Sequence, residues 1–375
     1  MKYYIIAGEA SGDLHGSNLI KELKNLDQAA DIRCWGGDLM QQAGGNLVKH
    51  YRDLAFMGFA EVVKNLGTIL GNLKFCKQDI LEFKPDALIL IDYPGFNLRI
   101  AKWAKQQKLK LIFYISPQVW AWKENRVKQM RNNIDKMIVI IPFEKDYFKN
   151  KWNWDVEYVG HPLVEVIESY KQQAYSDKAN LTIGDQSSPI VALLPGSRKQ
   201  EVEKKLPIML EVSKYFPEYQ FVVAEAPSIE DEFYKNFTKP YANVSAAKNQ
   251  TYDLLVQAKA ALVTSGTATL ETALFGVPEV VCYKGSAISY HIGKRLIKVK
   301  YISLVNLIMN KLVVNELIQN DLTVENLKIE LNELLRNEKR IAEMKKDYTE
   351  LKKILSEGGN ASVNAAMSIV KFLAK

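Results

Sequence analysis

Asp92 is the clearest candidate for a residue that moves a proton. It directly follows the apolar, strand-length segment Ala87–Ile91 and precedes Pro94 and Gly95. α/β enzymes collect reactive groups at the carboxyl ends of such strands, where a carboxylate can take the proton of a substrate hydroxyl. We therefore predict a general base at Asp92. The structural alternative is an aspartate that caps the Pro-Gly turn.

A glycine-containing turn, Gly8–Gly16, follows the first apolar segment and leads into a helix pattern. Such a turn brings backbone N–H groups and a helix N-terminus to a sheet edge, where phosphate groups bind. The motif is neither the GxGxxG dinucleotide fingerprint nor a Walker A loop. Ser11, Gly12 and Asp13 are its candidate phosphate contacts. The structural alternative is a tight turn capped by Ser11 or Asp13.

A second loop of this kind, Leu194–Arg198, follows the apolar segment Ile190–Leu194. The planar guanidinium of Arg198 presents several N–H donors in a geometry that suits a diphosphate, and Ser197 stands beside it. This loop is therefore a candidate site for a phosphorylated ligand. A surface arginine in an ordinary loop is the alternative.

Ser265, Gly266 and Thr267 begin a helix pattern after the apolar segment Ala260–Val263. Backbone amides and hydroxyls at a helix N-terminus meet phosphate oxygens well, and Glu271, one turn later, could accept hydrogen bonds from vicinal ribose hydroxyls. Together these residues favour a nucleotide. A Ser/Thr N-cap with an acidic residue in the first turn of the helix is the alternative.

Two segments could contact sugar or lipid. The loop Ser116–Trp122 carries amide and indole groups, although its aromatic residues could equally pack in the core. The segment Phe59–Leu73 has apolar residues at helical spacing, and Val62, Leu66 and Ile69 lie in this stripe. Such a stripe must be buried, either by the protein's own core or by lipid.

A basic segment and the overall charge favour anionic partners. Val280–Asn315 has no Asp or Glu, and its cations include Lys294, Arg295 and Lys298. The alternatives for this segment are a solvated basic face and a surface for anionic lipid or phosphate. The net charge of +7 agrees with an anionic partner but does not identify one.

Several other classes of protein find little support in the sequence. The histidines are dispersed, no Asp-x-Asp pair occurs, and there is no GxSxG motif, so we expect neither a metal site nor a serine hydrolase. No apolar run approaches the roughly 18 residues of a membrane span. The three separated cysteines suggest no disulfide framework, which fits a reducing cytoplasm.

The elements that must position these residues alternate between strand and helix, which predicts parallel sheets covered on both faces. At about 150 residues per domain, 375 residues predict two or three domains. A first series of strands is expected near Tyr3–Ala7, Ala87–Ile91, Leu111–Ile115, Lys136–Ile140 and Val156–Val159. A second series is expected near Ile190–Leu194, Gln220–Ala224, Ala260–Val263 and Glu279–Tyr283. Glu165–Ser188 is the predicted linker, Val324–Leu355 a charged helical region, and a last helix starts near Ser362.

Taken together, these segments resemble the lipid-A-disaccharide synthase family of inverting glycosyltransferases. The resemblance extends over nearly the whole chain. It rests on eight segments in order: Gly8–Asp13, Met57–Val62, Asp92–Asn97, Tyr114–Trp122, Gly160–Pro162, Leu194–Arg198, Ser265–Glu271 and Ser303–Leu307. The chain departs from the usual family pattern at Glu279, where an uncharged residue is more common, and at Val305, which replaces a frequent proline.

The resemblance implies a fold of the B type, in which two Rossmann-like domains face a cleft and the C-terminal helix crosses back to the first domain. The expected boundaries are 1–164 with the helix 356–375 for the acceptor and lipid domain, and 165–355 for the UDP-sugar domain.

The resemblance also implies a reaction and a set of roles. UDP-2,3-diacylglucosamine and 2,3-diacylglucosamine 1-phosphate (lipid X) would form a β-1,6-linked disaccharide 1-phosphate and UDP, without a metal or other cofactor. Asp92 would deprotonate the acceptor's 6-hydroxyl, and Glu9 is a second candidate acid or orienting group. Arg198 and the Ser265–Thr267 turn would neutralise the leaving diphosphate, Glu271 would contact the ribose, and Asn306 would lie near the nucleotide.

The implied setting is the cytoplasm, with peripheral attachment to phospholipid at the inner face of the cytoplasmic membrane. No nucleic-acid partner is expected, and the sequence allows a homodimer without indicating one. The alternative enzyme is another UDP-N-acetylglucosamine protein of the same fold, either a 2-epimerase or a peptidoglycan glycosyltransferase. A nucleotide-binding module at the membrane surface is the non-enzymatic alternative.

Overall fold

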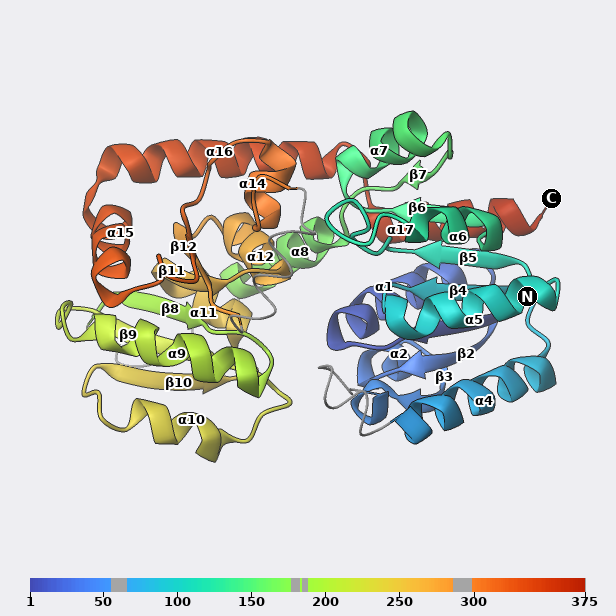
Figure 1. Cartoon of the computed structure of the whole chain (residues 1–375), viewed down its shortest axis with the longest axis horizontal. Helices are drawn as coiled ribbons and strands as arrows, with labels where there is room; N and C mark the ends of the chain where they lie inside the picture. The colour runs from blue at the N-terminus through green and yellow to red at the C-terminus, as the bar shows by residue number, and fades with distance from the viewer. Residues whose placement is uncertain (55–65, 177–182, 184–187, 286–298, 375) are drawn as a thin grey trace. The chain divides into compact units, whose positions relative to one another are not determined.

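A computed structural model describes residues 1–54, 66–176, 183, 188–285 and 299–374 of the chain. The chain divides into two compact units, one comprising Met1–Pro162 and Leu355–Lys375, the other Leu163–Ile354. Each unit contains a parallel β-sheet with helices packed against it (Figure 1).

In the first unit, the described residues form a seven-stranded sheet with strand order β3-β2-β1-β4-β5-β6-β7. The strands are β1 (Lys2–Ala7), β2 (Asp31–Gly36), β3 (Asn46–His50), β4 (Ala87–Ile91), β5 (Leu111–Tyr114), β6 (Lys136–Val139) and β7 (Glu157–Tyr158). The helices are α1 (Ala10–Leu26), α2 (Asp38–Gln42), the short helix η1 (Tyr51–Leu54), α4 (Leu66–Phe83), α5 (Pro94–Gln106), α6 (Arg126–Asn133), α7 (Pro142–Trp152) and α17 (Ala361–Leu373).

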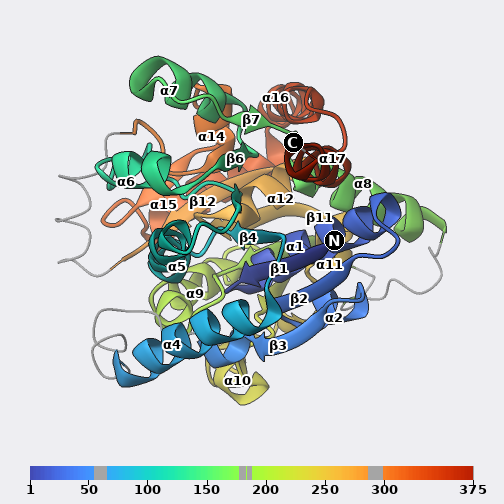
Figure 2. The ribbon, with the colours of Figure 1, turned by 90° about the vertical axis from the view of Figure 1, so that its right-hand side faces the viewer.

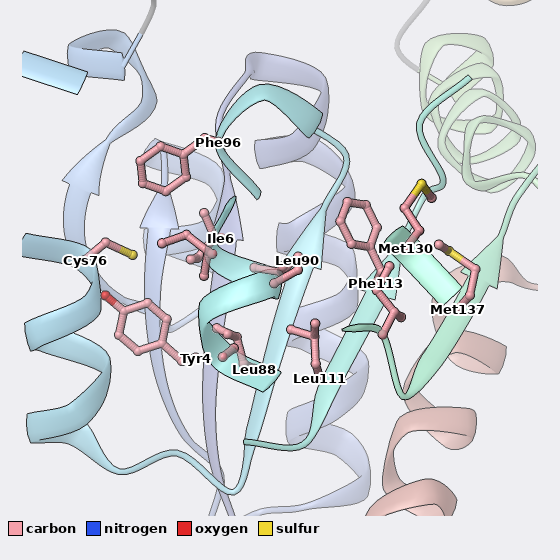
Figure 3. Packing of buried hydrophobic residues seen from close by; sticks show 14 of the residues in the cluster. Tyr4, Ile6, Cys76, Leu88, Leu90, Phe96, Leu111, Phe113, Met130 and Met137 are labelled. Carbon is pink, nitrogen blue, oxygen red and sulfur yellow. The ribbon is translucent and has the colours of Figure 1, made fainter. Parts of the chain in front are cut away.

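Alternate residues of the central strands form one buried layer of the core (Figure 3). Side chains two apart on a strand share a face, so Tyr4 and Ile6 of β1 lie on the same side as Leu88 and Leu90 of β4. The residues between them, such as Ile5, are buried as well. Because both faces are covered, these strands read as continuous apolar runs and were predictable from the sequence.

In the second unit, the described residues form a six-stranded sheet with strand order β10-β9-β8-β11-β12-β13. The strands are β8 (Ile190–Leu194), β9 (Gln220–Glu225), β10 (Val244–Lys248), β11 (Ala258–Thr264), β12 (Glu279–Tyr283) and β13 (Glu316–Ile318). The helices are α8 (Pro162–Ser176), α9 (Lys199–Ser213), α10 (Asp231–Thr238), α11 (Thr251–Gln257), α12 (Thr267–Phe275), α14 (Leu304–Met309), α15 (Val324–Arg336) and α16 (Glu338–Ser356), of which α8 and α16 begin or end at the unit boundary.

The last helix belongs to the first unit, although it follows the whole of the second unit in the sequence. α17 packs against α1 (Figures 1 and 2). Ala365, Ala366 and Ile369 are buried there, and the Ser368 hydroxyl donates a 2.6 Å hydrogen bond to Glu157 of β7. This confirms the prediction that the C-terminal helix crosses back.

The sequence predictions differ from the structure in two respects. Strands β2, β3, β10 and β13 were not predicted. The segment from Glu165 was predicted to be a linker, but α8 continues through it to Ser176 and buries Ile167 and Ala174. Among the described helices, none is both long and apolar enough to cross a membrane.

Candidate functional site

Glu9 and Asp92 lie at the point of the first sheet where the strand order reverses. β1 and β4 are neighbours in register, with Ala7 opposite Ile91, so the loops that leave their carboxyl ends diverge from one place. Ligands of open α/β sheets bind at such a switch point. The sequence predicted both residues, and the topology now brings them to the same edge.

The electrostatics of this pair suit proton transfer. Burial, together with the negative charge of Glu9, raises the pKa of Asp92 to about 7, and a backbone N–H at Tyr93 opposes the increase. A carboxyl group with a pKa near neutral pH can accept a proton and later release it. Asp92 therefore has the properties expected of a general base.

The backbone around Asp92 is held in an uncommon conformation. Asp92 and Tyr93 both have positive φ, 42° and 49°. The buried Asn97 amide stabilises this turn by donating to the Asp92 carbonyl at 2.8 Å and to the Ile91 carbonyl at 3.1 Å. Gly8 leaves room for the Tyr93 ring, because a Cβ at position 8 would lie 2.2 Å from it. Such strain concentrates at functional sites, where neighbouring contacts maintain it.

Glu144 is a third acidic residue near this pair, and the sequence analysis missed it. Its carboxyl group is buried in the first turn of α7 and accepts hydrogen bonds from Trp120 Nε1 at 3.0 Å and from the Ile141 backbone N–H at 3.2 Å. Burial raises its pKa to about 8, and the charge of Asp92 adds to the increase. Its position just beyond the strand near Lys136–Ile140 was the signal that could have found it.

Most of the Gly8–Gly16 segment is helical, because α1 begins at Ala10, and the segment lacks the caps that the structural alternative placed in it. Neither Ser11 nor Asp13 caps α1, whose N-cap position is occupied by Glu9. Instead the buried Asp13 carboxylate accepts hydrogen bonds from the backbone N–H groups of Gly37, Leu39 and Met40, so it caps the neighbouring helix α2. Gly12 packs closely on Ala7, where a Cβ would lie 3.1 Å away, and Ser11 is exposed. Their contact with a phosphate stays a prediction.

Two loops that were predicted to bind phosphate lie next to each other at the switch point of the second sheet. β8 and β11 are neighbours, with Leu194 opposite Val263, and the loops 195–198 and 265–266 follow them. Arg198 is half exposed, and one of its guanidinium nitrogens lies 3.4 Å from Glu201. Gly196 and Gly266 have φ of 121° and 138°, values that only glycine adopts readily. The two predicted loops are thus adjacent.

Lys205 adds a buried positive charge beneath these loops. Its ammonium group donates to the Thr264 hydroxyl and lies 3.9 Å from Glu201, and only 3% of the side chain is exposed. A Cβ at Gly196 would lie 3.4 Å from Lys205 Nζ, which places the charge directly under the 195–198 loop. Burial lowers the pKa of Lys205, and Glu201 opposes this shift. The sequence analysis missed Lys205.

Glu271 lies in the second turn of α12, where its carboxylate accepts a 2.9 Å hydrogen bond from the Tyr252 hydroxyl. Burial raises its pKa. A carboxylate held in place by a neutral hydroxyl keeps acceptor capacity for further hydroxyl donors. Its geometry is compatible with a ribose contact, and that role stays a prediction.

Asn306 has a structural role in the turn before β13. It is fully buried in α14, and its side-chain oxygen accepts from the backbone N–H groups of Val313 and Val314. Its amide nitrogen donates to the Val314 carbonyl at 2.8 Å and to Glu316 at 2.9 Å. Every hydrogen-bonding group of the side chain is therefore engaged in shaping the turn before β13. Its place near a nucleotide stays a prediction.

Most of the predicted lipid-contact residues fall outside the described residues. These are Val62, Lys294, Arg295, Lys298 and the side chain of Leu66. In the described part of the stripe, Ile69 and Leu73 pack against the core, whereas Leu70 is 56% exposed. The stripe on α4 is therefore partly core and partly surface.

Comparisons with known proteins show the family to which this chain belongs. Residues 3–371 match a family model described as lipid-A-disaccharide synthetase. The chain belongs to this family. Lipid-A-disaccharide synthase from Syntrophus aciditrophicus is 38% identical over 97% of this chain and 96% of its own length. The enzyme of the same name from Trichlorobacter lovleyi is 37% identical over 95% of this chain and 93% of its own.

Solved structures agree on the fold. UDP-GlcNAc 2-epimerase from Neisseria meningitidis, solved with UDP-GlcNAc, has a TM-score of 0.67 at 13% identity. The match covers 100% of this chain and 100% of the epimerase chain. The calicheamicin glycosyltransferase CalG4 has a TM-score of 0.63 at 13% identity, with 100% of this chain and 98% of that chain covered. At this identity the likeness shows the B-type fold alone. The family match identifies the chain as a glycosyltransferase and does not favour the alternative enzymes.

Proposed function

We propose that this protein transfers 2,3-diacylglucosamine from its UDP derivative to the 6-hydroxyl of 2,3-diacylglucosamine 1-phosphate, with release of UDP. The product is the β-1,6-linked disaccharide 1-phosphate. The observation that carries the proposal is Asp92, an acid with a raised pKa held at the switch point of the first sheet. Family membership supplies the chemistry of donor and acceptor.

In the proposed step, Asp92 accepts the proton of the acceptor's 6-hydroxyl. The oxygen attacks the anomeric carbon of the donor from the side opposite the diphosphate, a carbon–oxygen bond forms, and the bond to the diphosphate breaks. The α-linked donor therefore gives a β-linked product. Glu9 acts by holding the pKa of Asp92 near neutral pH, because its charge disfavours ionised Asp92.

The departing diphosphate gains negative charge as its bond to the sugar breaks. We assign its stabilisation to Arg198, to the amides and hydroxyls at the start of α12, and to the buried Lys205. Preorganised donors and charges of this kind lower the energy of a transition state because they need no reorganisation during the reaction. Ser197, Ser265, Gly266 and Thr267 supply the donors, and Glu271 accepts from the ribose.

Both substrates carry acyl chains, so we also propose peripheral attachment to phospholipid at the cytoplasmic face of the inner membrane. The net charge of +7 supports this attachment, because such membranes are anionic. The exposed Leu70 and Phe75 of α4 provide apolar surface on the first unit.

The test is turnover by purified protein in detergent and EDTA with the diacylated UDP-sugar and the acceptor 1-phosphate. UDP release and lipid product mass are followed together. We expect stoichiometric UDP and disaccharide 1-phosphate. Absence of the lipid product, together with consumption of UDP-N-acetylglucosamine in a parallel reaction, would contradict the proposed substrates.

A further inference from the structure

A cluster of one tryptophan and two cations lies on the first unit, in the turn between β5 and α6 and at the first residue of α6. Trp122 is 45% exposed, which is unusual for so large an aromatic side chain. Lys123 Nζ lies 4.2 Å from the centre of the indole, and the guanidinium carbon of Arg126 lies 5.9 Å from it. We call these three residues the Trp122 cluster.

The two cations have no acidic partner within the described residues. Glu124 lies between them in the sequence, but its carboxylate contacts other residues. It forms an ion pair with Lys151 at 2.5 Å and accepts a 2.8 Å hydrogen bond from the Tyr147 hydroxyl. Partial burial lowers the pKa of both cations, and Arg126 further lowers that of Lys123. Two like charges held close together without a counter-charge form a favourable place for an anion.

The backbone fixes this arrangement. Lys123 has a positive φ of 55°, uncommon for a lysine, and its carbonyl accepts the Arg126 N–H at 3.0 Å as α6 begins. The turn leaves β5 beside the proposed base, because the Asp92 backbone N–H donates to the carbonyl of Tyr114, the last residue of β5, at 3.2 Å. Within the turn, Trp120 Nε1 donates to the buried Glu144 at 3.0 Å. The turn that carries the Trp122 cluster is therefore anchored beside the proposed base.

We propose that the Trp122 cluster binds the phosphate group of the lipid acceptor. Lys123 and Arg126 pair with the phosphate oxygens, and the exposed indole packs against the apolar part of the same molecule. This assignment rests on the proposed function, which places the acceptor beside Asp92 and the donor's diphosphate at the switch point of the second sheet. It makes the acceptor's phosphate a specificity determinant.

The experiment compares the acceptor 1-phosphate with its dephosphorylated analogue in the wild type, Lys123→Met and Arg126→Met. Loss of one charged contact should lower the preference for the phosphorylated acceptor, measured as the ratio of kcat/KM values, on the order of tenfold. Lys128→Met, which removes an exposed lysine of α6, is the matched control and should keep the wild-type ratio. An unchanged ratio in both test variants would overturn the proposal, as would an equal loss with both acceptors, which indicates a merely structural role.

Two further measurements distinguish an acceptor site from a membrane contact. If the variants lose binding to phosphatidylglycerol vesicles but keep the wild-type ratio in detergent, the cluster contacts membrane headgroups and the acceptor assignment is wrong. Calorimetric titration with the sugar 1-phosphate lipid in micelles tests the site without turnover. Phosphate-dependent binding that the double variant loses would support the site even if the wild type made no disaccharide, whereas equal binding by both proteins would contradict it.

Discussion

At the scale of single residues, the first unit concentrates carboxyl groups whose charges oppose one another. The pKa of Asp92 is raised to about 7 and that of Glu144 to about 8, with burial as the main cause in both. Asp92 is therefore partly ionised at neutral pH, and its ionisation should govern the reaction rate. The neighbouring negative charge of Glu9 raises this pKa, so a change at Glu9 should shift it.

The pH dependence of kcat/KM should show this ionisation. Because the base must be ionised, we expect the rate to rise with pH and to level off above about pH 7. Glu9→Gln removes a like charge, so it should lower the pKa of Asp92 and move the acidic limb to lower pH. Glu82→Gln, an exposed acid at the end of α4, is the control. An acidic limb that stays in place in Glu9→Gln would refute the coupling.

Lys205 should contribute to nucleotide binding through its charge. We expect Lys205→Met to weaken UDP binding on the order of tenfold and to leave uridine binding nearly unchanged, because only UDP carries the diphosphate. Lys214→Met, at the exposed end of the same helix, should bind UDP like the wild type. Calorimetry with both ligands measures this directly. Equal weakening for UDP and uridine would show that Lys205 acts only on the structure of the loop.

The sequence predicted individual site residues at strand ends, but it did not predict which of them lie next to each other in the fold. Asp92 was predictable because a uniformly apolar strand precedes it. Its adjacency to Glu9 was not, since it depends on β4 pairing with β1, a strand far from it in the sequence. Lys205 resembles its solvent-exposed neighbour Lys204 in the sequence, and only the packing of α9 beneath the 195–198 loop distinguishes the two.

At the scale of elements, strand β12 contains an unusual residue. Glu279 begins this strand and is completely buried, and neither carboxyl oxygen has a hydrogen-bond partner in the described structure. Burial raises its pKa well above the ordinary value. A buried, unpartnered carboxyl group of this kind destabilises the folded state once it must ionise.

The stability of Glu279→Val should therefore depend on pH in a defined way. Because the folded pKa of Glu279 exceeds the unfolded pKa, the wild type loses stability as pH rises from about 4.5 toward the folded value. The advantage of the variant should grow by about 1.4 kcal/mol per pH unit in that range and stay constant below it. Urea denaturation of both proteins between about pH 4 and 8 measures the difference. A difference independent of pH would show that Glu279 does not titrate as described.

The elements that the sequence missed are those without a uniform apolar signal. β2 contains Arg33, which forms an ion pair with Asp79, and β3 has no fully buried residue. β10 buries only Ala247, and β13 has three residues. These strands lie toward sheet edges and depend on pairing with a neighbour, which no local pattern records. The central strands, which position the candidate sites, were predicted within a few residues.

At the scale of the whole molecule, the chain builds two sheets with separate cores and completes the first with its last helix. α17 presents small residues to α1, which allows the two helices to pack closely. The first unit therefore depends on residues that follow the whole of the second unit in the sequence.

A charge placed in this contact should destabilise the first unit. Ala365 is fully buried, so Ala365→Glu should lower the free energy of unfolding by roughly 3 kcal/mol or more. Met367→Glu changes a residue of the same helix that is 53% exposed and should have little effect. UDP affinity should be unchanged in both, because the proposed nucleotide site lies in the second unit. Equal stability of the two variants in urea would contradict the packing of α17.

The most direct test of the central claim is turnover by Asp92→Asn with the diacylated UDP-sugar and the acceptor 1-phosphate, with UDP affinity measured in parallel. Removal of a general base predicts a rate at least about a hundredfold lower, with UDP affinity equal to that of the wild type. Wild-type turnover by Asp92→Asn would show that another group takes the proton from the acceptor hydroxyl.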